Sequence, residues 1–387
     1  MADFRFLTAG ESHGACLTAI IEGLPAGLKI DREGIDRDLA RRQQGYGRGG
    51  RMKIEKDRVT VLSGIRFGET IGSPITLQIQ NKDGKNWAEK MAPFGESAGE
   101  RVTAPRPGHA DYAGIQKYDR QDIRDILERS SARETAARVA AGALAKQFLA
   151  ACGVEIVSQV VNIGGITATS RQREKMLRGD AASALNCFDP VAEEQMKERI
   201  KEAAKDGDTL GGVFEVAVRG VPVGIGSHIQ WDRRLDARLA AAFMSIQAVK
   251  GVEIGDGFRL ADLPGSMAHD ELYMDDRNRV YRRTNHAGGI EGGISNGEEI
   301  VLRAVMKPIP TLMKPLASVD IATHSPVAAV KERSDVCAVT AASVVGEAMA
   351  ALIITQAVLE KFGGDAMVDV LTALQSYKRR LARENLQ

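Results

Sequence analysis

Two alanine-rich segments, 132–151 and 339–362, constrain the fold of this chain most strongly, because each would form a helix that is apolar almost all round. Such a helix must be covered on more than one side. Small alanine and glycine side chains also let a neighbouring layer approach closely. We therefore expect helices held between β-sheets, an arrangement that fits better than a doubly wound dinucleotide-binding sheet.

The segment 338–359 also resembles a membrane span, but Glu347 in its middle would be costly in lipid. A buried helix of a soluble protein is the better interpretation. The first residues of the chain are too polar for a signal peptide. We expect reduced cytoplasmic thiols, with neither disulfides nor zinc, because no metal-binding spacing joins Cys16, Cys152, Cys187 and Cys337.

Strand-like and helical segments are spread over the whole length. The strand candidates are 4–8, 59–67, 75–80, 154–163, 213–219 and 300–306. Helical periodicity adds 33–42, 193–204, 234–247 and 366–383. Because no linker separates two halves, we predict one large α+β domain spanning 1–387. Loops this long are uncommon unless they build a site, which we expect of 43–51, 81–114, 262–296 and 307–325.

The charge balance restricts the class of ligand. The chain has 52 basic and 51 acidic residues. This balance argues against a general nucleic-acid or membrane-surface protein, since these carry a basic excess. Within the basic set, 34 Arg stand against 18 Lys. Arginine binds phosphate and carboxylate through paired hydrogen bonds, so this ratio favours a small polyanionic ligand. Genomic codon usage is the alternative explanation.

The loop GYGRGG at 45–50 matches the spacing GxGxxG. The dinucleotide fingerprint requires a strand before it and a helix after it, whereas a charged helix precedes this loop, so we do not expect dinucleotide binding. Around the loop stand Arg41, Arg42, Arg48 and Arg51, which repel one another unless an anion or an acidic partner neutralises them. The alternatives are a solvated charged loop and a lid that clamps a polyanion.

Two histidines lie in turns stiffened by glycine or proline. His13 lies in the sequence GESHG, and His109 follows PRPG, with Arg106 close by. Rigid presentation of a titratable ring suits general acid catalysis. A single histidine more often packs or caps a helix, so each signal alone is weak.

The residues at the start of the first alanine-rich helix allow two interpretations. Ser130 or Ser131 can cap the helix, with Glu134 completing a capping box from Ser131. The same N-terminus, between Arg129 and Arg133, is also suited to phosphate. The two interpretations are compatible.

Before the second alanine-rich helix, Arg333 stands two residues from Asp335. An ordinary ion pair is the simpler interpretation of this pair, and a functional role is the alternative.

Eight stretches occur in one order along nearly the whole chain. They are GESHG at 10–14, RRQQGYGRGGRMKIE at 41–55, RPGHADYAG at 106–114, ERSSARETAARVA at 128–140, SIQAVKGVEIG at 245–255, GGISNG at 292–297, KPIPT at 307–311 and RSDVCAVTAASVV at 333–345. In this order they closely resemble the chorismate synthase family, with no departure at a functional position. Each stretch alone is modestly specific, and the ordered set is highly specific.

The resemblance implies a carbon–oxygen lyase of the shikimate pathway and aromatic amino-acid biosynthesis. Its reaction is the anti-1,4-elimination of phosphate and a ring proton from 5-enolpyruvylshikimate 3-phosphate, giving chorismate. Reduced FMN is implied, although no net redox change occurs. The substrate has roughly three to four negative charges at neutral pH, which suits the arginine excess. The implied fold is a β–α–β sandwich of long helices between antiparallel sheets, in a homotetramer.

The resemblance also implies residue roles. His13 would protonate the departing phosphate, His109 would supply a proton to the reduced flavin, and Asp335 would relay the proton taken from the substrate. The substrate anions would be held by Arg42, Arg48, Arg106, Arg133 and Arg333.

Flavin contacts follow from the same resemblance, with the FMN phosphate expected near Lys307. They fall on Arg129, Ser130, Ser131, Gln247, Ala248, Gly292, Lys307, Pro308, Ile309, Pro310, Thr311 and Arg333. No reductase-like insertion is apparent, so we expect an external flavin reductase, with NADPH at most an indirect reductant. We expect a cytoplasmic protein with no metal and no nucleic-acid or membrane partner.

Two rival functions make different demands on the sequence. A nucleic-acid-binding protein built on the arginine loops would need aromatic platforms, yet only 5% of the residues are aromatic. A phosphotransferase using the glycine loop would require a Gly-Lys-Ser/Thr triplet, which the sequence lacks.

Overall fold

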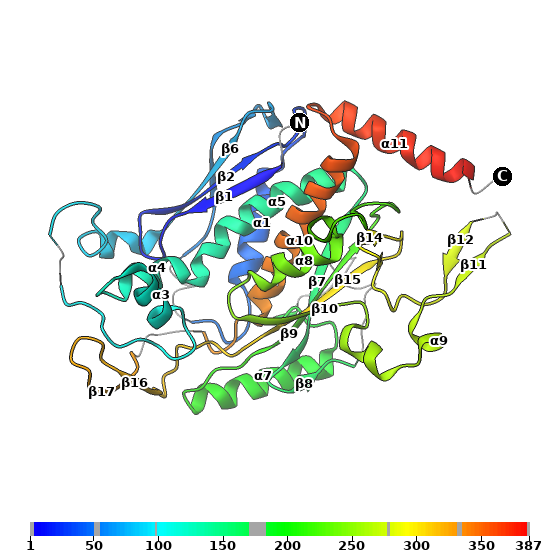
Figure 1. The fold of residues 1–387 in the computed structure, drawn as a ribbon. Coiled ribbons are helices and arrows are strands. Elements are labelled where there is room, and N and C mark those ends of the chain that lie inside the picture. Colours follow the sequence, from blue (N-terminus) through cyan, green and yellow to red (C-terminus); the bar gives the residue numbers. More distant parts are fainter. Residues whose placement is uncertain are drawn as a thin grey trace.

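Helix α10 (Val339–Phe362) lies at the centre of the molecule and has the bounds predicted from its apolar pattern. The computed structural model describes residues 4–49, 55–96, 99–169, 183–276, 279–330 and 335–384. One side of α10 packs against α5 (Thr135–Ala151), and the other side faces a β-sheet (Figure 1). By length and composition α10 could cross a membrane, but 89% of its most apolar window is buried inside the protein, so it is a core helix.

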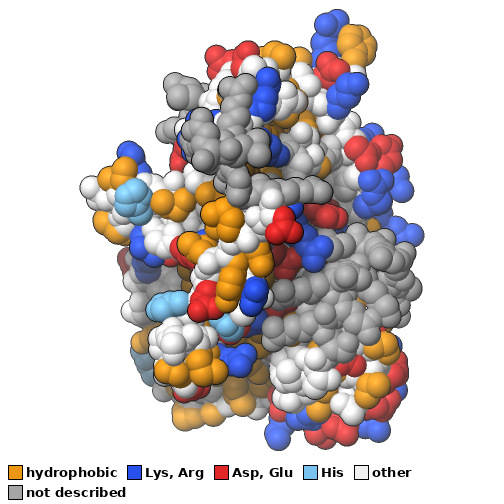
Figure 2. Space-filling model, turned by 90° about the vertical axis from the view of Figure 1, so that its right-hand side faces the viewer, with side chains coloured by type: hydrophobic (Ala, Val, Ile, Leu, Met, Phe, Trp, Pro, Cys, Tyr) orange, Lys and Arg blue, Asp and Glu red, His pale blue; other side chains and the backbone are white. Residues whose placement is uncertain are grey.

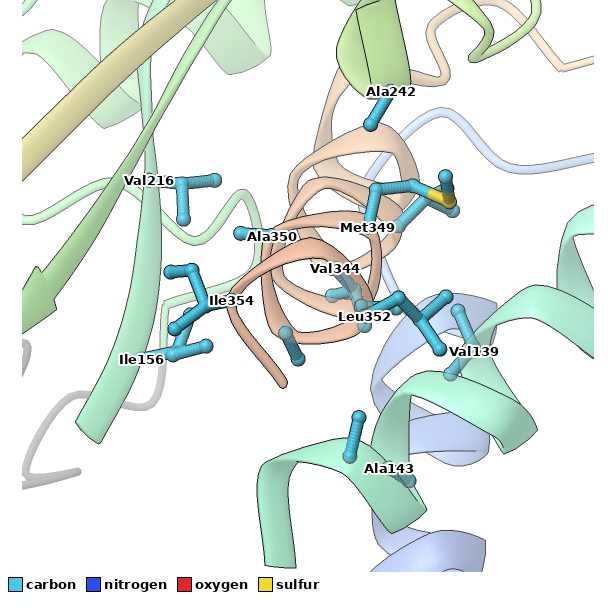
Figure 3. Packing of buried hydrophobic residues seen from close by; sticks show 14 of the residues in the cluster. Val139, Ala143, Ile156, Val216, Ala242, Val344, Met349, Ala350, Leu352 and Ile354 are labelled. Carbon is cyan, nitrogen blue, oxygen red and sulfur yellow. The ribbon is translucent and has the colours of Figure 1, made fainter. Parts of the chain in front are cut away.

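The two alanine-rich helices approach each other closely because small residues line their contact. A Cβ atom added to Gly142 of α5 would lie 2.4 Å from the Cβ of Ala348 on α10, a distance that real side chains do not tolerate. Figure 3 shows Val139 and Ala143 of α5 facing the same surface of α10. Close packing therefore depends on glycine and alanine at these positions.

The first sheet has the strand order β1-β2-β6-β3, and every neighbouring pair is antiparallel. Its strands are β1 (Arg5–Ala9), β2 (Cys16–Glu22), β6 (Ile75–Gln80) and β3 (Val59–Ser63). Along β2 the buried residues Leu17, Ala19 and Ile21 alternate with more exposed ones, as in a strand with one covered face. Helix α5 packs against β2 and β6, so this sheet covers the α5 side of the helical layer.

The second sheet has the order β10-β15-β9-β7-β8 and is also antiparallel. Its strands are β10 (Val249–Ile254), β15 (Ile300–Met306), β9 (Gly212–Arg219), β7 (Glu155–Ile163) and β8 (Ile166–Thr167). Phe214 and Val216 of β9 lie against Gly346 of α10, and Ile156 of β7 joins them (Figure 3). The sheet therefore covers the α10 side of the helical layer.

Two further helices complete the layer between the sheets. Helix α1 (Arg32–Gln43) packs on α5 and α10, while α8 (Leu235–Met244) packs on α10 and β10. The predicted sandwich of buried helices between antiparallel sheets is confirmed. One hydrophobic cluster runs through both sheets and the helices, from Phe4 to Leu374.

The remaining elements lie outside these layers. The helices are α3 (Asp111–Tyr118), α4 (Arg124–Ser130), α7 (Pro190–Lys205), α9 (Gly265–Ala268) and α11 (Met367–Glu384), with short 3₁₀ segments η1 (Lys82–Trp87), η2 (Ala132–Glu134), η3 (Trp231–Arg233) and η4 (Gly257–Asp262). The short hairpins pair β4 (Ile65–Arg66) with β5 (Glu69–Thr70), β11 (Leu272–Met274) with β12 (Val280–Arg282), β13 (Ile290–Glu291) with β14 (Ile294–Ser295), and β16 (Ala317–Val319) with β17 (Pro326–Ala328).

Several expectations about the elements were wrong in detail. Strands β2 and β10 were missed, although β2 carries a clear alternation. The predicted strand 59–67 is interrupted at Gly64, whose φ of +81° turns the chain into a separate hairpin. The predicted loops contain η1, α9, two hairpins and β16, so they are only partly irregular. The helix predicted at 234–247 ends at Met244, which leaves Gln247 in a turn.

Candidate active site

The turn that carries His13 connects β1 to β2 and lies against α4. Gly10 has a φ of +108°, and an added Cβ would meet the Cys16 carbonyl oxygen at 2.3 Å, so the turn requires glycine here. The Ser12 amide donates to the Glu128 carbonyl at 3.0 Å, and Asn81 Nδ2 donates to the Glu11 and Gly14 carbonyls. The backbone around His13 is therefore fixed by two other parts of the chain.

The His13 ring is held by a buried carboxylate. Its Nδ1 lies 2.9 and 3.0 Å from the two carboxylate oxygens of Glu128, and its backbone amide donates to the same group at 2.9 Å. Arg124 donates to Glu128 from the other side at 2.8 Å. Burial by itself raises the pKa of Glu128, but His13 and Arg124 lower it below its usual value. Glu128 is thus a carboxylate at neutral pH.

His109 occupies a similar arrangement in the loop before α3. Its Nδ1 hydrogen-bonds to Asp111, and Arg106 Nε donates to the same carboxylate at 2.8 Å. Arg106 also donates to Thr311 Oγ1 at 3.2 Å. Burial raises the pKa of Asp111, while hydrogen bonds from His109 and Arg106 outweigh it and hold the pKa well below its usual value. Helices α3 and α4 pack on each other, so the two histidines belong to neighbouring elements.

The segment 307–311 lies beside the His109 loop. Lys307 Nζ donates to the Gly108 carbonyl, and Thr209 Oγ1 donates to the Ile309 carbonyl at 2.7 Å. A cavity of about 440 Å³ is lined by Gly108, Lys307, Pro308, Ile309 and Pro310, together with Arg199 and Ala203 of α7 and Asp206, Asp208, Thr209 and Leu210 after it. The predicted flavin segment and His109 are therefore brought together.

Arg42 and Arg133 form a buried pair around one carboxylate. Arg133 Nη1 donates to both oxygens of Asp57, at 2.7 and 2.6 Å, and Arg42 Nη1 lies 3.5 Å from Asp57. Arg133 Nε donates to Asn81, the residue that also holds the His13 turn. Asn81 thus connects the arginine pair to His13.

The arginine pair has spare hydrogen-bonding capacity. Among the described residues, neither Arg42 Nη1 nor Arg133 Nη2 has a hydrogen-bond partner, although both atoms are buried. Burial, together with the charges of Arg133 and Arg48, lowers the pKa of Arg42 to about 9 despite the attraction of Asp57. Arg42 therefore stays charged at neutral pH, and an anion beside it would be favourable.

Arg48 reaches Asp335 from the glycine loop. Its Nη1 lies 2.8 Å from the Asp335 carboxylate, which also accepts a hydrogen bond from the Gly49 amide at 2.6 Å. Arg41 instead donates to Glu347 at 2.8 and 2.6 Å, inside the helical layer. Three of the four arginines around this loop thus have acidic partners, and Arg51 lies outside the described residues.

The predicted flavin residues near α4 divide between two surfaces. Arg129 donates to the Thr8 and Gly10 carbonyls and lines a cavity of about 420 Å³ together with Gln247. Ser131 Oγ donates to Ser12 Oγ, whereas Ser130 Oγ donates back to the Ile126 carbonyl within its own helix. Ser131 caps the turn Ala132–Glu134 by accepting from the Arg133 amide. The Glu134 carboxylate turns instead to Thr8, Arg138 and Gln247, so the capping box expected from Ser131 does not form.

Gln247 and Ala248 suit a bound polar group. The Gln247 Oε1 atom is buried and has no hydrogen-bond partner in the described part of the chain. The Ala248 carbonyl accepts from the Lys307 amide at 2.9 Å, which connects this turn to the segment 307–311. An acceptor atom without a partner, in a cavity that Arg129 also lines, fits a polar ligand such as a flavin.

One predicted flavin residue, Gly292, is not brought to this group. Gly292 lies in the turn between β13 and β14, near the Ile300 end of β15, whereas Lys307 follows the opposite end of that strand. At about 3.4 Å per residue, the length of β15 separates the two ends by roughly 20 Å. Arg333 lies outside the described residues.

The sequence interpretation gave no role to several residues that shape the site. Asp111 had a signal, since it stands two positions after His109. Glu128 is 115 residues from His13, and Asp57 is 76 residues from Arg133, so no local pattern connects these pairs. Trp87, whose ring centroid lies 4.2 Å from that of His13, gave no signal either.

Comparisons with known proteins agree on one family. A family model described as chorismate synthase matches residues 4–359. A chorismate synthase of Geobacter sulfurreducens is 60% identical over 384 residues, covering 96% of this chain and 98% of that protein, and one of Geobacter metallireducens is 58% identical with the same coverage. A crystal structure of chorismate synthase superposes with a TM-score of 0.80 at 44% identity, covering 99% of both chains.

The comparisons support a lyase of aromatic amino-acid biosynthesis and do not support the nucleic-acid-binding alternative. On the face shown in Figure 2, the described basic and acidic side chains lie interspersed among hydrophobic ones. The match extends over nearly the whole length at high identity, and this chain belongs to the chorismate synthase family.

Proposed function

We propose that this site eliminates phosphate from 5-enolpyruvylshikimate 3-phosphate, with His13 and the buried arginines acting on the same substrate. The observation that carries this proposal is Asn81, which hydrogen-bonds to both the His13 turn and Arg133. A proton donor and a cationic pair with unused hydrogen-bonding capacity are thereby held in one place. That combination suits a leaving phosphate.

Substrate binding falls to five arginines in this proposal. Arg42 Nη1 and Arg133 Nη2 have no hydrogen-bond partner among the described residues. Arg48 and Arg106 present guanidinium groups already oriented by Asp335 and Asp111. Arg333 is included on the resemblance alone. Because the acidic partners offset most of the local positive charge, the site can hold these arginines together before the substrate arrives.

The elimination breaks one C–O bond and one C–H bond and forms one C=C bond, so no net oxidation occurs. His13 donates a proton to the departing phosphate. His109, oriented by Asp111, holds a proton at the flavin side of the site, and Asp335 receives the ring proton that leaves the substrate. The Asp335 carboxylate is held in place for that step by its 2.8 Å ion pair with Arg48.

Reduced FMN, when bound, supplies electron density that weakens the allylic C–O bond. Arg129, Ser130, Ser131, Gln247, Ala248 and the segment Lys307, Pro308, Ile309, Pro310 and Thr311 would hold it, with Lys307 close to its phosphate. The buried Gln247 Oε1, which has no hydrogen-bond partner in the part of the chain that the structure describes, supports this assignment. Gly292 and Arg333 remain part of the proposal.

The wider properties of the protein are proposals of the same kind. We place a homotetramer of single-domain chains in the cytoplasm, supplied with reduced flavin by a separate reductase. The continuous hydrophobic cluster from Phe4 to Leu374 supports one domain. NADPH would act only through that reductase.

Anaerobic incubation of the protein with reduced FMN and the substrate tests the proposed function. We expect chorismate absorbance and free phosphate to appear in equal amounts. The same mixture with oxidised FMN should give neither product. Absence of both products under reducing conditions, with folded protein and saturating flavin, would contradict the proposal.

A further inference from the structure

The hydrogen bonds of the His13 ring gather at one nitrogen. Both carboxylate oxygens of Glu128 lie within 3.0 Å of Nδ1. Glu128 is 2% exposed, and its ionised form can only accept hydrogen bonds. Nδ1 must therefore carry its hydrogen in both charge states of the ring, which leaves Nε2 as the nitrogen that gains or loses a proton.

The plane of the ring is fixed independently. The Trp87 ring lies 4.2 Å from the His13 ring at a tilt of 32°. Arg124 lies 4.7 Å above the same indole, and it also donates to Glu128. Arg124 therefore contacts both Trp87 and Glu128, the two residues that contact the His13 ring.

We propose that Glu128 is a positioning residue that fixes His13 in the tautomer presenting Nε2 to the ligand and that favours the protonated ring. The orientation of the His13 ring by Glu128 follows from the contacts alone. The importance of Glu128 for catalysis rests on the proposed function. A carboxylate on Nδ1 orients an imidazole and stabilises the imidazolium in other acid–base sites.

Other charged groups act on the ring less directly. Arg124 opposes protonation but is paired with Glu128. Lys90 lies 5.3 Å beyond Trp87, and Glu11 belongs to the turn itself, with its carboxylate near Gly14. Of these groups, Glu128 is the one in direct contact with the imidazole.

Trp87 supplies a readout that does not depend on catalysis. The chain has two tryptophans, and Trp231 is 80% exposed, whereas Trp87 lies against His13. In a Trp231→Phe background, emission therefore comes from Trp87. An imidazolium quenches a stacked indole more strongly than a neutral imidazole, so Trp87 emission should fall as His13 becomes protonated.

The experiment is a pH titration of Trp87 emission in Trp231→Phe, with and without Glu128→Gln. We expect the midpoint to move to lower pH by about one to two units when the charge is removed, since an opposite charge in contact has this effect on a titrating group. Arg124→Gln should move the midpoint the other way, which keeps the test intact if Glu128→Gln fails to fold. A matched control is Glu215→Gln, another buried carboxylate paired with arginine, which faces away from α10 on β9.

The outcomes separate this inference from the proposed function. A transition that persists in His13→Gln, or equal midpoints in the parent, Glu128→Gln and Arg124→Gln, would overturn the positioning role. With turnover as a second readout, we expect Glu128→Gln to lower kcat by about 10²–10⁴, with little change in KM. A shifted midpoint combined with full turnover in His13→Ala would leave the positioning role standing and would remove His13 from the mechanism.

Discussion

His13 and His109 each turn Nδ1 towards a buried carboxylate and leave the other side of the ring less constrained. We expect His13→Ala and His109→Ala each to reduce turnover by about 10²–10⁴, the usual contribution of an acid–base group. Steady-state assays at saturating FMN under anaerobic conditions measure this. His286, which pairs with Asp256 in another part of the fold, offers a matched control, and His286→Ala should keep near-normal turnover. Normal turnover in both site variants would exclude the two assignments.

Asp335 combines a proposed proton-accepting role with an ion pair to Arg48. We expect Asp335→Asn to slow loss of the ring hydrogen while KM changes little, because the amide cannot take up a proton at that oxygen. Single-turnover measurements with substrate deuterated at the reacting carbon test this, and the isotope effect should increase.

Arg48→Lys is the companion variant for Asp335. It keeps the charge but loses the paired geometry, so it should raise KM more than it lowers kcat. If Asp335→Asn also raises KM and leaves single-turnover chemistry unchanged, Asp335 serves only to hold Arg48.

Among the helices, the contact between α5 and α10 reverses the usual preference of a helix interior for alanine over glycine. Replacing glycine by alanine in a helix interior usually stabilises it by about 1 kcal/mol. A Cβ at Gly142 would lie 2.4 Å from the Ala348 Cβ and 2.5 Å from its Cα, so the two helices would have to separate. We expect Gly142→Ala to destabilise the protein by about 1–3 kcal/mol, as overpacked cores do.

Urea unfolding measures the effect of Gly142→Ala. Ala150→Gly, near the exposed end of the same helix, changes helix propensity without changing the contact with α10. It should destabilise the protein by about 1 kcal/mol. A stabilised Gly142→Ala variant would show that the helices do not approach as closely as described.

At the scale of the whole molecule, Glu347 joins three helices to the second sheet. It accepts hydrogen bonds from Arg41 of α1, Lys146 of α5 and Ser158 of β7, although it is 1% exposed. We expect Glu347→Gln to lower the free energy of unfolding by about 1–3 kcal/mol, because the partly exposed cations Arg41 and Lys146 lose a buried carboxylate partner. Glu360→Gln, which breaks a half-exposed pair with Arg238, should change it by no more than about 1 kcal/mol.

The same carboxylate contributes to acid stability. Burial raises the pKa of Glu347, but Lys146 and Arg41 outweigh burial and place it well below its usual value of 4.5. A lowered folded-state pKa contributes stability that is complete above about pH 4.5 and is lost as the pH falls towards the folded-state pKa. The unfolding free energy of the parent should therefore drop below pH 4.5 more steeply than that of Glu347→Gln. Equal slopes in urea titrations at pH 3 to 7 would contradict this.

Much of the fold follows from local pattern. Apolar periodicity predicted α10 with its observed bounds and placed α5 within three residues, because a helix that is apolar all round has few alternatives. Strands β6 and β15 also have the predicted bounds. Strand β10 was missed because Gly251 interrupts its β-branched run, and its pairing with β15 carries a register shift there.

Local sequence patterns are enough to predict the histidines in stiff turns, the arginines around a glycine loop and the two helices that must be buried. The acidic partners of these histidines and arginines depend on the tertiary structure. Arg41 meets Glu347 across 306 positions, and His13 meets Glu128 across 115. Charges can pair with any opposite charge that packing brings near, so the choice of partner depends on how helices and sheets stack. Local spacing carries no information about that choice.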